Sequence, residues 1–370
     1  EMEEELCRVL ADFVRIMEGY RVDDYRATAS SAISEASNSL YVLGKIHQLT
    51  GLSVTVLSNS EQRFLSYKAL AAMEDNFNKI IEKGTAILDL DGGSFQISLF
   101  DKDALVTTQN IRMGSLRVRE RLAGIQSETE HYEEMVEELI WNEVSSFKKM
   151  YLKDRKIENI MLIGDVFTDS VYQNIEEKTT KIISRENFNT WYEKIIRQSP
   201  MELAVKLGIP LENASLMYPS AVIYKCLIDM MGAEHIWIPG VHMTRGIAYE
   251  YAEQMKLLKG GHNFENDILM AAKNIGKRYA VNRPHVQNLE MTALAMFDAT
   301  KKMHGMKERE RLLLQMAVML HDVGKYISFN NVADSSYNII MSNEIIGLSH
   351  IEREMVALIA RYNTVTLPSY

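Results

Sequence analysis

The stretch that decides the fold is Thr85–Ile111, with the sequence TAILDLDGGSFQISLFDKDALVTTQNI. Its three apolar or alternating segments are separated by Asp91-Gly92-Gly93 and by Asp101-Lys102-Asp103. Asp-Gly and Gly-Gly pairs favour tight hairpin turns, and an alternation of period two is typical of strands. The stretch therefore predicts a meander of three strands.

Working outward, the pattern predicts helices and strands on both sides of this meander. On the amino-terminal side we expect helices at 3–19, 31–50 and 60–72 and short strands at 25–29 and 53–57. On the carboxyl-terminal side we expect a helix at 129–152, a strand at 157–163, a helix at 221–231 and a strand at 235–238. Such an order predicts an α/β protein with a mixed sheet.

Beyond a linker predicted at Gly260-Gly261-His262-Asn263, the periodicity is helical nearly to the end. We expect helices at 268–279, 285–304, 308–321, 342–344 and 350–362. The predicted domains are 1–82, 83–258 and 265–370.

Composition excludes several classes of protein. A net charge of −9 argues against a nucleic-acid partner, and no apolar run approaches the roughly 18 residues of a membrane span. Cys7 and Cys226 lie far apart, which predicts buried reduced thiols in a cytoplasmic protein. Because Glu1 lies inside an apparent amphipathic helix, we expect the chain to be a fragment without its true start.

Asp89-Leu90-Asp91-Gly92-Gly93-Ser94 is the first candidate site. An acid at the end of a buried strand suits a divalent cation, and two glycines let backbone amides approach a phosphate closely. The Ser94 hydroxyl adds a donor. The alternative is a plain β-hairpin turn.

Leu57-Ser58-Asn59-Ser60-Glu61-Gln62-Arg63 is the second candidate. Glu61 is placed to orient or deprotonate a water that attacks phosphorus. The alternative is a purely structural role in the first turn of a helix, capped by Ser58, Asn59 or Ser60. A third, weaker signal is the glycine turn Ile163-Gly164-Asp165.

Together, these motifs resemble those of the exopolyphosphatase/guanosine-pentaphosphatase family over about residues 1–255. The family's Asp-Ile-Gly-Gly-Gly-Ser-Thr-Glu matches Asp89–Gln96, and its Ser-Gly-x-Glu-Glu-Ala-Arg matches Ser58–Phe64. The resemblance implies a two-lobed actin-like (ribonuclease H-like) fold whose first lobe is incomplete here, since the family's first phosphate loop has no counterpart.

The resemblance also implies an activity: Mg²⁺-dependent hydrolysis of terminal phosphoanhydride bonds in polyphosphate or guanosine pentaphosphate. Glu61 would be catalytic, Gly92, Gly93, Ser94 and Gly164 would bind phosphate, and Asp89 would hold Mg²⁺. A homodimer is the expected assembly.

Several positions depart from the family pattern: Ser34, Asn59, Arg63, Asp91, Phe95, Gln96 and Phe167. Several of these changes remove a phosphate donor or a ligand, and each lost charge-assisted contact costs about 1.5–3 kcal/mol. These changes favour the alternative function, in which the chain is a catalytically degraded family member that acts as a regulatory protein and binds polyphosphate or a nucleotide.

The last third of the chain carries His285 and, after an apolar helix, His321-Asp322-Val323-Gly324-Lys325. Two imidazoles and a carboxylate suit a divalent metal. The segment resembles the HD phosphohydrolase superfamily, which implies an all-α HD-type domain with His285, His321 and Asp322 as ligands. Ser335 and Asn363 replace two further family histidines, and Asp334 and His350 lie nearby as possible replacements. The alternative is that His321 and Asp322 only cap a helix.

Overall fold

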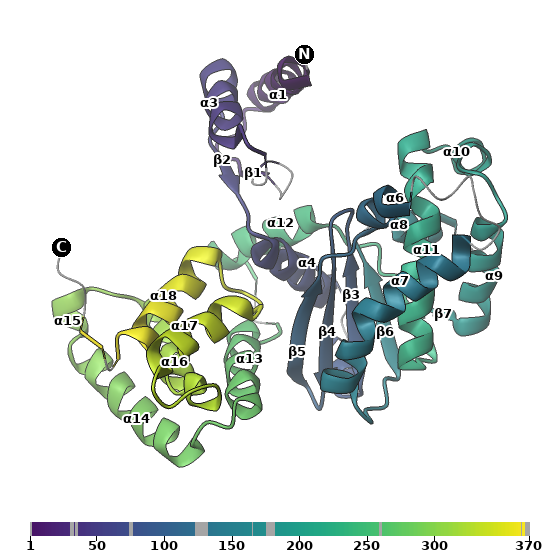
Figure 1. The fold of residues 1–370 in the computed structure, drawn as a ribbon. Coiled ribbons are helices and arrows are strands. Elements are labelled where there is room, and N and C mark those ends of the chain that lie inside the picture. The colour runs from purple at the N-terminus through teal and green to yellow at the C-terminus, as the bar shows by residue number, and fades with distance from the viewer. Residues whose placement is uncertain are drawn as a thin grey trace.

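The computed structural model describes residues 2–29, 33, 36–73, 77–122, 132–164, 166–174, 182–258, 261–363 and 365–366. Its centre is a six-stranded mixed sheet of order β5-β4-β3-β6-β8-β7 (Figure 1). The strands are β3 (Thr85–Leu90), β4 (Phe95–Asp101), β5 (Ala104–Ile111), β6 (Asn159–Ile163), β7 (Ile182–Ser184) and β8 (His235–Trp237).

The predicted meander is confirmed. β3, β4 and β5 pair antiparallel in chain order, while β6 runs parallel to β3 on its other side. The turn between β4 and β5 places Lys102 and Asp103 at φ of 54° and 56°, the left-handed region that a tight hairpin needs. The two central strands β3 and β6 are buried along their whole length, as expected for strands covered on both faces.

One face of the sheet is covered by helices that follow β5 in the chain (Figure 1). These are α6 (Ser115–Leu122), α7 (Tyr132–Phe147), α8 (Val166–Asn174), α9 (Arg185–Ile196), α10 (Pro200–Leu207) and α11 (Leu211–Met231). Their apolar side chains form one core with those of β3, β4 and β6.

The other face packs on α4 (Asn59–Met73), α5 (Phe77–Ile81) and the carboxyl-terminal helices. Ile87, Phe100 and Met161 of the sheet share a continuous core with Leu70 of α4 and Leu312 of the helical part. Helix α12 (Met243–Gln254) crosses α4 so closely that a Cβ on Gly246 would lie 1.9 Å from the Leu65 carbonyl oxygen.

The carboxyl-terminal part is entirely helical within the residues described (Figure 1). It contains α13 (Phe264–Arg278), α14 (Arg283–Ala299), α15 (Lys301–His304), α16 (Glu308–Leu320), a short 3₁₀ helix η2 (Val323–Tyr326), α17 (Val332–Ser342) and α18 (His350–Arg361). Ser60 at the start of α4 donates a hydrogen bond to the Ile345 carbonyl. This part is therefore joined to the first candidate site through α4.

The amino-terminal residues form a small separate cluster. Helices α1 (Met2–Gly19) and α3 (Ser39–Thr50) bury Cys7 and Val42 together, beside the two-stranded parallel sheet of β1 (Ala27–Ala29) and β2 (Val54–Val56).

Some predicted boundaries were wrong. A helix was predicted at 342–344, but the helix in this region is α17, which covers Val332–Ser342. The helix predicted at 221–231 is α11, which starts ten residues earlier, at Leu211, and contains Pro219. The predicted helix at 129–152 changes to a π-helical turn (Lys148–Leu152) at its end. The helix predicted at 31–50 is interrupted at 36–38 and continues as α3 from Ser39, while residues 31, 32, 34 and 35 lie outside the described part.

None of the described helices is long and apolar enough to cross a membrane.

Candidate functional site

The first site lies where β3 ends, beside the end of β6. Asp89 is the second-last residue of β3 and pairs with Ile163 on β6. Gly164 follows at φ +113°, and a Cβ there would lie 2.3 Å from the Leu90 carbonyl and 2.7 Å from Asp89 Oδ1. A residue with a side chain would not fit, so this glycine lets β6 end against the Asp89 carboxylate.

Arg63, from the second turn of α4, is the centre of the site. Its buried guanidinium lies 2.7 Å from Asp89 Oδ1 and 2.8 Å from Asp91 Oδ2. It also donates a hydrogen bond of 3.0 Å to Ser94 Oγ. One cation therefore gathers both acids and the hydroxyl predicted for this site.

Asp91 closes the loop from the other side. Its Oδ1 accepts the backbone amides of Gly93 and Ser94, each at 2.7 Å. These amides form the kind of nest that binds a phosphate oxygen, and here a carboxylate oxygen occupies it. The Gly92 amide donates no hydrogen bond to any residue described, so one predicted donor is free.

The same loop docks on α6. The backbone amides of Leu116 and Arg117 donate to the Gly92 carbonyl at 3.0 and 3.1 Å. A Cβ on Gly114 would lie 2.3 Å from the Asp91 carbonyl, so only glycine allows this approach. The loop is thus anchored to the start of α6, while the side chain of Asp91 is 46% exposed to solvent.

Glu61 lies in the first turn of α4 and forms a complete capping box with Ser58. Its Oε2 accepts from the Ser58 amide at 2.9 Å and from Ser58 Oγ at 2.7 Å, while the Glu61 amide donates back to Ser58 Oγ at 3.3 Å. Glu61 therefore has the structural role considered as the alternative: it forms part of the cap of α4, with Ser58 as the N-cap residue. Glu61 Oε1 makes no hydrogen bond within the described chain.

Burial raises the pKa of Asp89, while the Arg63 guanidinium opposes that rise and the nearby Asp91 carboxylate adds to it. Asp89, Asp91 and Ser94 all present oxygen atoms, the ligands that Mg²⁺ takes. These oxygens converge on Arg63, which shows that the site accommodates positive charge. The donor set therefore fits a hard cation, provided that Arg63 gives up part of its contacts.

Several predicted positions lie elsewhere or outside the description. Ser34 and Asp165 are outside the described residues. Phe167 is fully buried and packs against Phe188 and Tyr224, so it serves the core of the sheet.

The second site joins α14 to the end of α16. One possible ligand atom each from His285, His321 and Asp322 lie within 4.8 Å of one another. His321 and Asp322 are buried, and His285 is exposed. The structure therefore brings together the three residues predicted as ligands.

His321 is held in a defined tautomer. Its Nδ1 lies 2.7 Å from the Val318 carbonyl, which can only accept, so Nδ1 carries a proton and Nε2 is the nitrogen that faces Asp322. Asp322 Oδ1 lies 3.3 Å from that Nε2, and Asp322 Oδ2 pairs with Lys325 at 2.7 Å. Two imidazole nitrogens and a carboxylate oxygen suit Zn²⁺, Mn²⁺ or Fe²⁺.

Ser336 on α17 supports this turn from behind. Its hydroxyl accepts the Gly324 amide and donates to the His321 carbonyl, both at 2.9 Å. A Cβ on Gly324 would lie 2.3 Å from the Val332 carbonyl, which explains the glycine.

The nearby alternatives do not complete the cluster. Asp334 pairs with Arg361 at 2.7 Å, His350 contacts Arg353, and Asn363 is exposed. The set of candidate ligands found in the described chain therefore stays at three.

One polar network was not predicted. His262, in the predicted linker, contacts Asp267 Oδ2 at 2.6 Å, and the Tyr67 hydroxyl donates to the same oxygen at 2.5 Å. Burial, followed by the negative charge of Asp267, raises the pKa of Tyr67 well above its ordinary value. The sequence signal was a polar pair, His262 and Asp267, around the first turn of a helix. It gave no indication that Tyr67 is the partner.

Comparison with known proteins identifies the family and the fold. Residues 1–255 match the model of the Ppx/GppA phosphatase family, and residues 269–368 match that of Ppx/GppA phosphatase, domain III. A guanosine-5′-triphosphate,3′-diphosphate pyrophosphatase from Vibrio atlanticus is 18% identical over 345 residues, which cover 92% of this chain and 66% of the relative. A bifunctional 3-dehydroquinate synthase/phosphatase from Fusobacterium nucleatum is 20% identical over 256 residues, which cover 63% of this chain and 36% of the relative. The chain thus spans less than two thirds of either relative.

Solved structures show the same fold. An exopolyphosphatase from Cytophaga hutchinsonii superposes with a TM-score of 0.58 at 16% identity, covering 68% of this chain and 82% of that one. The Aquifex aeolicus Ppx/GppA family member gives 0.55 at 16% identity, covering 70% and 83%. The fold is the actin-like α/β type of these proteins, followed by a helical part. Because the family model matches 255 of the 370 residues, the chain belongs to the Ppx/GppA phosphatase family.

Proposed function

We propose that this chain hydrolyses terminal phosphoanhydride bonds in inorganic polyphosphate or guanosine pentaphosphate, with Mg²⁺ as cofactor. The observation that carries the proposal is the convergence of Arg63, the Gly92–Ser94 amides and Asp89 on one loop. Glu61 is two residues before Arg63 on the same helix, and its side-chain contacts in the described chain are to Ser58. Family membership supports the same reaction class.

In the proposed reaction, the terminal phosphoryl group takes the place of the Asp91 carboxylate. The amides of Gly92, Gly93 and Ser94 then donate to its oxygens, and Arg63 neutralises charge that develops in the transition state. Asp91 is able to leave because its side chain is half exposed. Mg²⁺ held by Asp89 would add positive charge at the bridging oxygens when bound.

Glu61 is proposed to orient the attacking water through Oε1, while Oε2 remains in the capping box. Anchoring one oxygen fixes the position of the other, which is what a catalytic base requires. The cap and the catalytic role are therefore compatible in one side chain.

The test compares Glu61→Gln with Glu61→Ala in a phosphate-release assay with polyphosphate and Mg²⁺. Glutamine retains an oxygen for the capping box but cannot accept the proton, so we expect release to fall about 100-fold or more. Glu61→Ala should lose the same activity and also about 1 kcal/mol of stability through the cap. If Glu61→Gln is as active as the wild type, the residue only caps the helix. If the wild type binds polyphosphate saturably but releases no phosphate, the chain is a binding or regulatory member.

We also propose that the helical part is HD-type and that His285, His321 and Asp322 hold a divalent metal. The fixed tautomer of His321 and the support from Ser336 favour this over simple helix capping. A cytoplasmic location and a homodimer stay predictions.

A further inference from the structure

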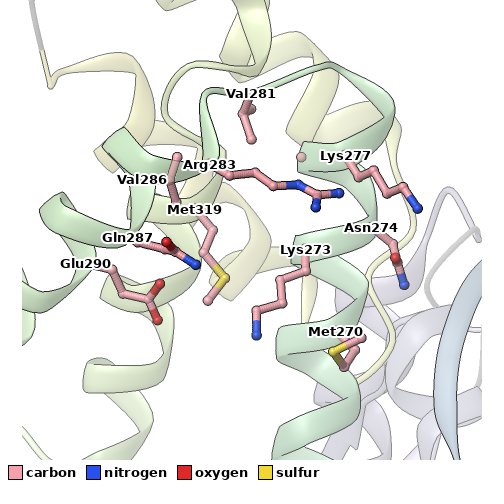
Figure 2. Close-up of a pocket in the computed structure, with 11 residues that line it drawn as sticks. Met270, Lys273, Asn274, Lys277, Val281, Arg283, Val286, Gln287, Glu290 and Met319 are labelled. Carbon is pink, nitrogen blue, oxygen red and sulfur yellow. The ribbon is translucent and has the colours of Figure 1, made fainter.

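A cavity lies in the helical part, apart from the Asp89 loop and next to the second site, since His285 lies between its lining residues Arg283 and Val286. It has a volume of about 330 Å³ and lies between α13 and α14, where Lys273 extends towards Glu290 across it (Figure 2). Sites for small molecules in proteins start at about this size.

The cavity is rich in uncompensated positive charge. Lys273, Lys277 and Arg283 form no ion pair with any residue that the structure describes, and the single carboxylate of the lining, Glu290, accepts a hydrogen bond from Gln315 at 2.7 Å. Three basic groups against one acidic group leave two positive charges in excess.

The molecule as a whole carries a net charge of −9. Four other arginines of the helical part form ion pairs: Arg309 with Glu352, Arg311 with Asp298, Arg353 with Glu344 and Arg361 with Asp334. Unpaired cations that line a concave surface attract an anion, because the low-dielectric walls concentrate their field.

The floor of the cavity is apolar. Val286 and Met319 are buried there, with Val281 beside them. Gly276 makes the floor possible, because a Cβ at this position would lie 3.1 Å from Val281 Cγ2. A flat apolar group fits such a floor, and a methionine thioether favours contact with an aromatic ring.

We propose that this cavity binds a small organic phosphate of the nucleoside diphosphate class. The phosphates lie between Lys273, Lys277 and Arg283, and the ring rests on Met319 and Val286. Gln287 at the rim offers an amide to the polar edge of the ring (Figure 2). Such a site is separate from the phosphate loop at Asp89, so its ligand is not the substrate of the proposed hydrolysis.

The test is a fluorescence titration of the full chain with a mant-labelled adenosine diphosphate. The variant K273E/K277Q/R283E removes the positive charge, and Lys302→Glu, on an exposed position of α15, is the matched control. The variant should fold, because the replaced side chains are exposed and a glutamate at the start of α14 favours the helix dipole. Equal melting temperatures confirm this, and the single variant R283E is a milder second test.

We expect saturable binding by the wild type and by K302E, at least a tenfold weaker affinity for the triple variant, and a smaller loss for R283E. Binding should weaken as salt rises. Glu61→Gln, in the other site, should leave the affinity for the labelled nucleotide unchanged.

Three results overturn the proposal: no binding by the wild type, unchanged binding by the triple variant, or loss of binding in Glu61→Gln alone. Inorganic pyrophosphate that competes as tightly as the labelled nucleotide would also overturn the role of the apolar floor.

Discussion

Arg63 and Asp91 form an ion pair of 2.8 Å in the middle of the proposed phosphate site. The other oxygen of Asp91 accepts the amides of Gly93 and Ser94. The two carboxylate oxygens thus occupy the donors proposed to bind the phosphoryl group. Under the proposed function, Asp91 is an internal anion that the substrate would have to displace.

This relationship predicts that Asp91→Gly increases the affinity for phosphate-containing ligands. The change frees the two amides and one contact of the Arg63 guanidinium, which stays paired with Asp89, and it removes a negative charge from the site. Each charge-assisted contact recovered is worth about 1.5–3 kcal/mol, so we expect inorganic pyrophosphate to bind at least tenfold more tightly. Isothermal titration calorimetry with Mg²⁺ measures this directly.

The control for Asp91→Gly is Asp154→Gly, at an exposed acid outside the site. It alters the net charge equally and should leave the affinity unchanged. Weaker binding by Asp91→Gly would show instead that Asp91 contributes a ligand, for example to a metal.

The fold was predictable wherever a local pattern decides it. Asp91-Gly92-Gly93 and Asp101-Lys102-Asp103 mark hairpin turns in any context, so the meander followed from sequence. The start of α11 was not predictable from a local pattern, because a proline such as Pro219 disfavours a helix interior, whereas burial against the sheet keeps this helix continuous. The segment at His262 was predicted as a linker because glycines precede it, but long-range contacts to Tyr67 place it in the core.

The site was predictable as a set of residues but not as a geometry. Asp89 and Ser94 lie together, as predicted, but the residue that joins them is Arg63, which stood out in the sequence only as a departure from the family pattern. The capping box of Ser58 and Glu61 is also visible as Ser-x-x-Glu, although the prediction did not use that spacing. The occupation of the amide nest by Asp91 could not be read from sequence, since it depends on one side-chain rotamer.

The tight junction of β6 with β3 predicts a large cost for Gly164→Ala. The alanine must adopt φ near +113° and its Cβ meets the Leu90 carbonyl, so we expect a loss of roughly 3 kcal/mol. Gly208→Ala is the matched control, since that glycine has φ +66° but nothing within 4 Å of its Cβ. It should lose about 1 kcal/mol. Urea denaturation of both variants measures the difference, and equal losses would rule out the clash.

The His285–His321–Asp322 cluster predicts metal binding that depends on both histidines. The wild type should bind Mn²⁺ or Zn²⁺ with a stoichiometry of about one at this cluster, and His321→Ala should abolish that binding. His350→Ala, outside the cluster, should retain it. Ser336→Ala should weaken it about tenfold, because the turn loses its support. Metal content near zero in wild type and His321→Ala alike would leave only the helix-capping role.

The buried network of Tyr67, His262 and Asp267 predicts a stability difference that changes with pH. Asp267 is fully buried, and its Oδ1 has no hydrogen-bond partner in the described chain. Its side-chain hydrogen bonds are therefore all made through Oδ2, which accepts from the Tyr67 hydroxyl. Tyr67→Phe removes this donor and should lower the free energy of unfolding by roughly 2–3 kcal/mol at pH 7.

The raised pKa of Tyr67 sets the sign of the pH effect. Below the ordinary tyrosine pKa of about 10, the hydroxyl keeps its proton in both the folded and unfolded states, and the stabilisation is complete. Above that pH the unfolded chain releases the proton while the folded chain retains it, so the unfolded state is favoured by up to about 1.4 kcal/mol per pH unit. The phenylalanine variant has no hydroxyl to titrate, so its stability does not fall in this way.

The difference in free energy of unfolding between the wild type and Tyr67→Phe should therefore become smaller from pH 9 to pH 11, as measured by urea denaturation at each pH. Tyr20→Phe, at an exposed tyrosine, is the control, and its free energy of unfolding should stay equal to that of the wild type at every pH. A gap that stays constant over this range would show that Tyr67 titrates normally in the folded protein and that its hydrogen bond to Asp267 is weak.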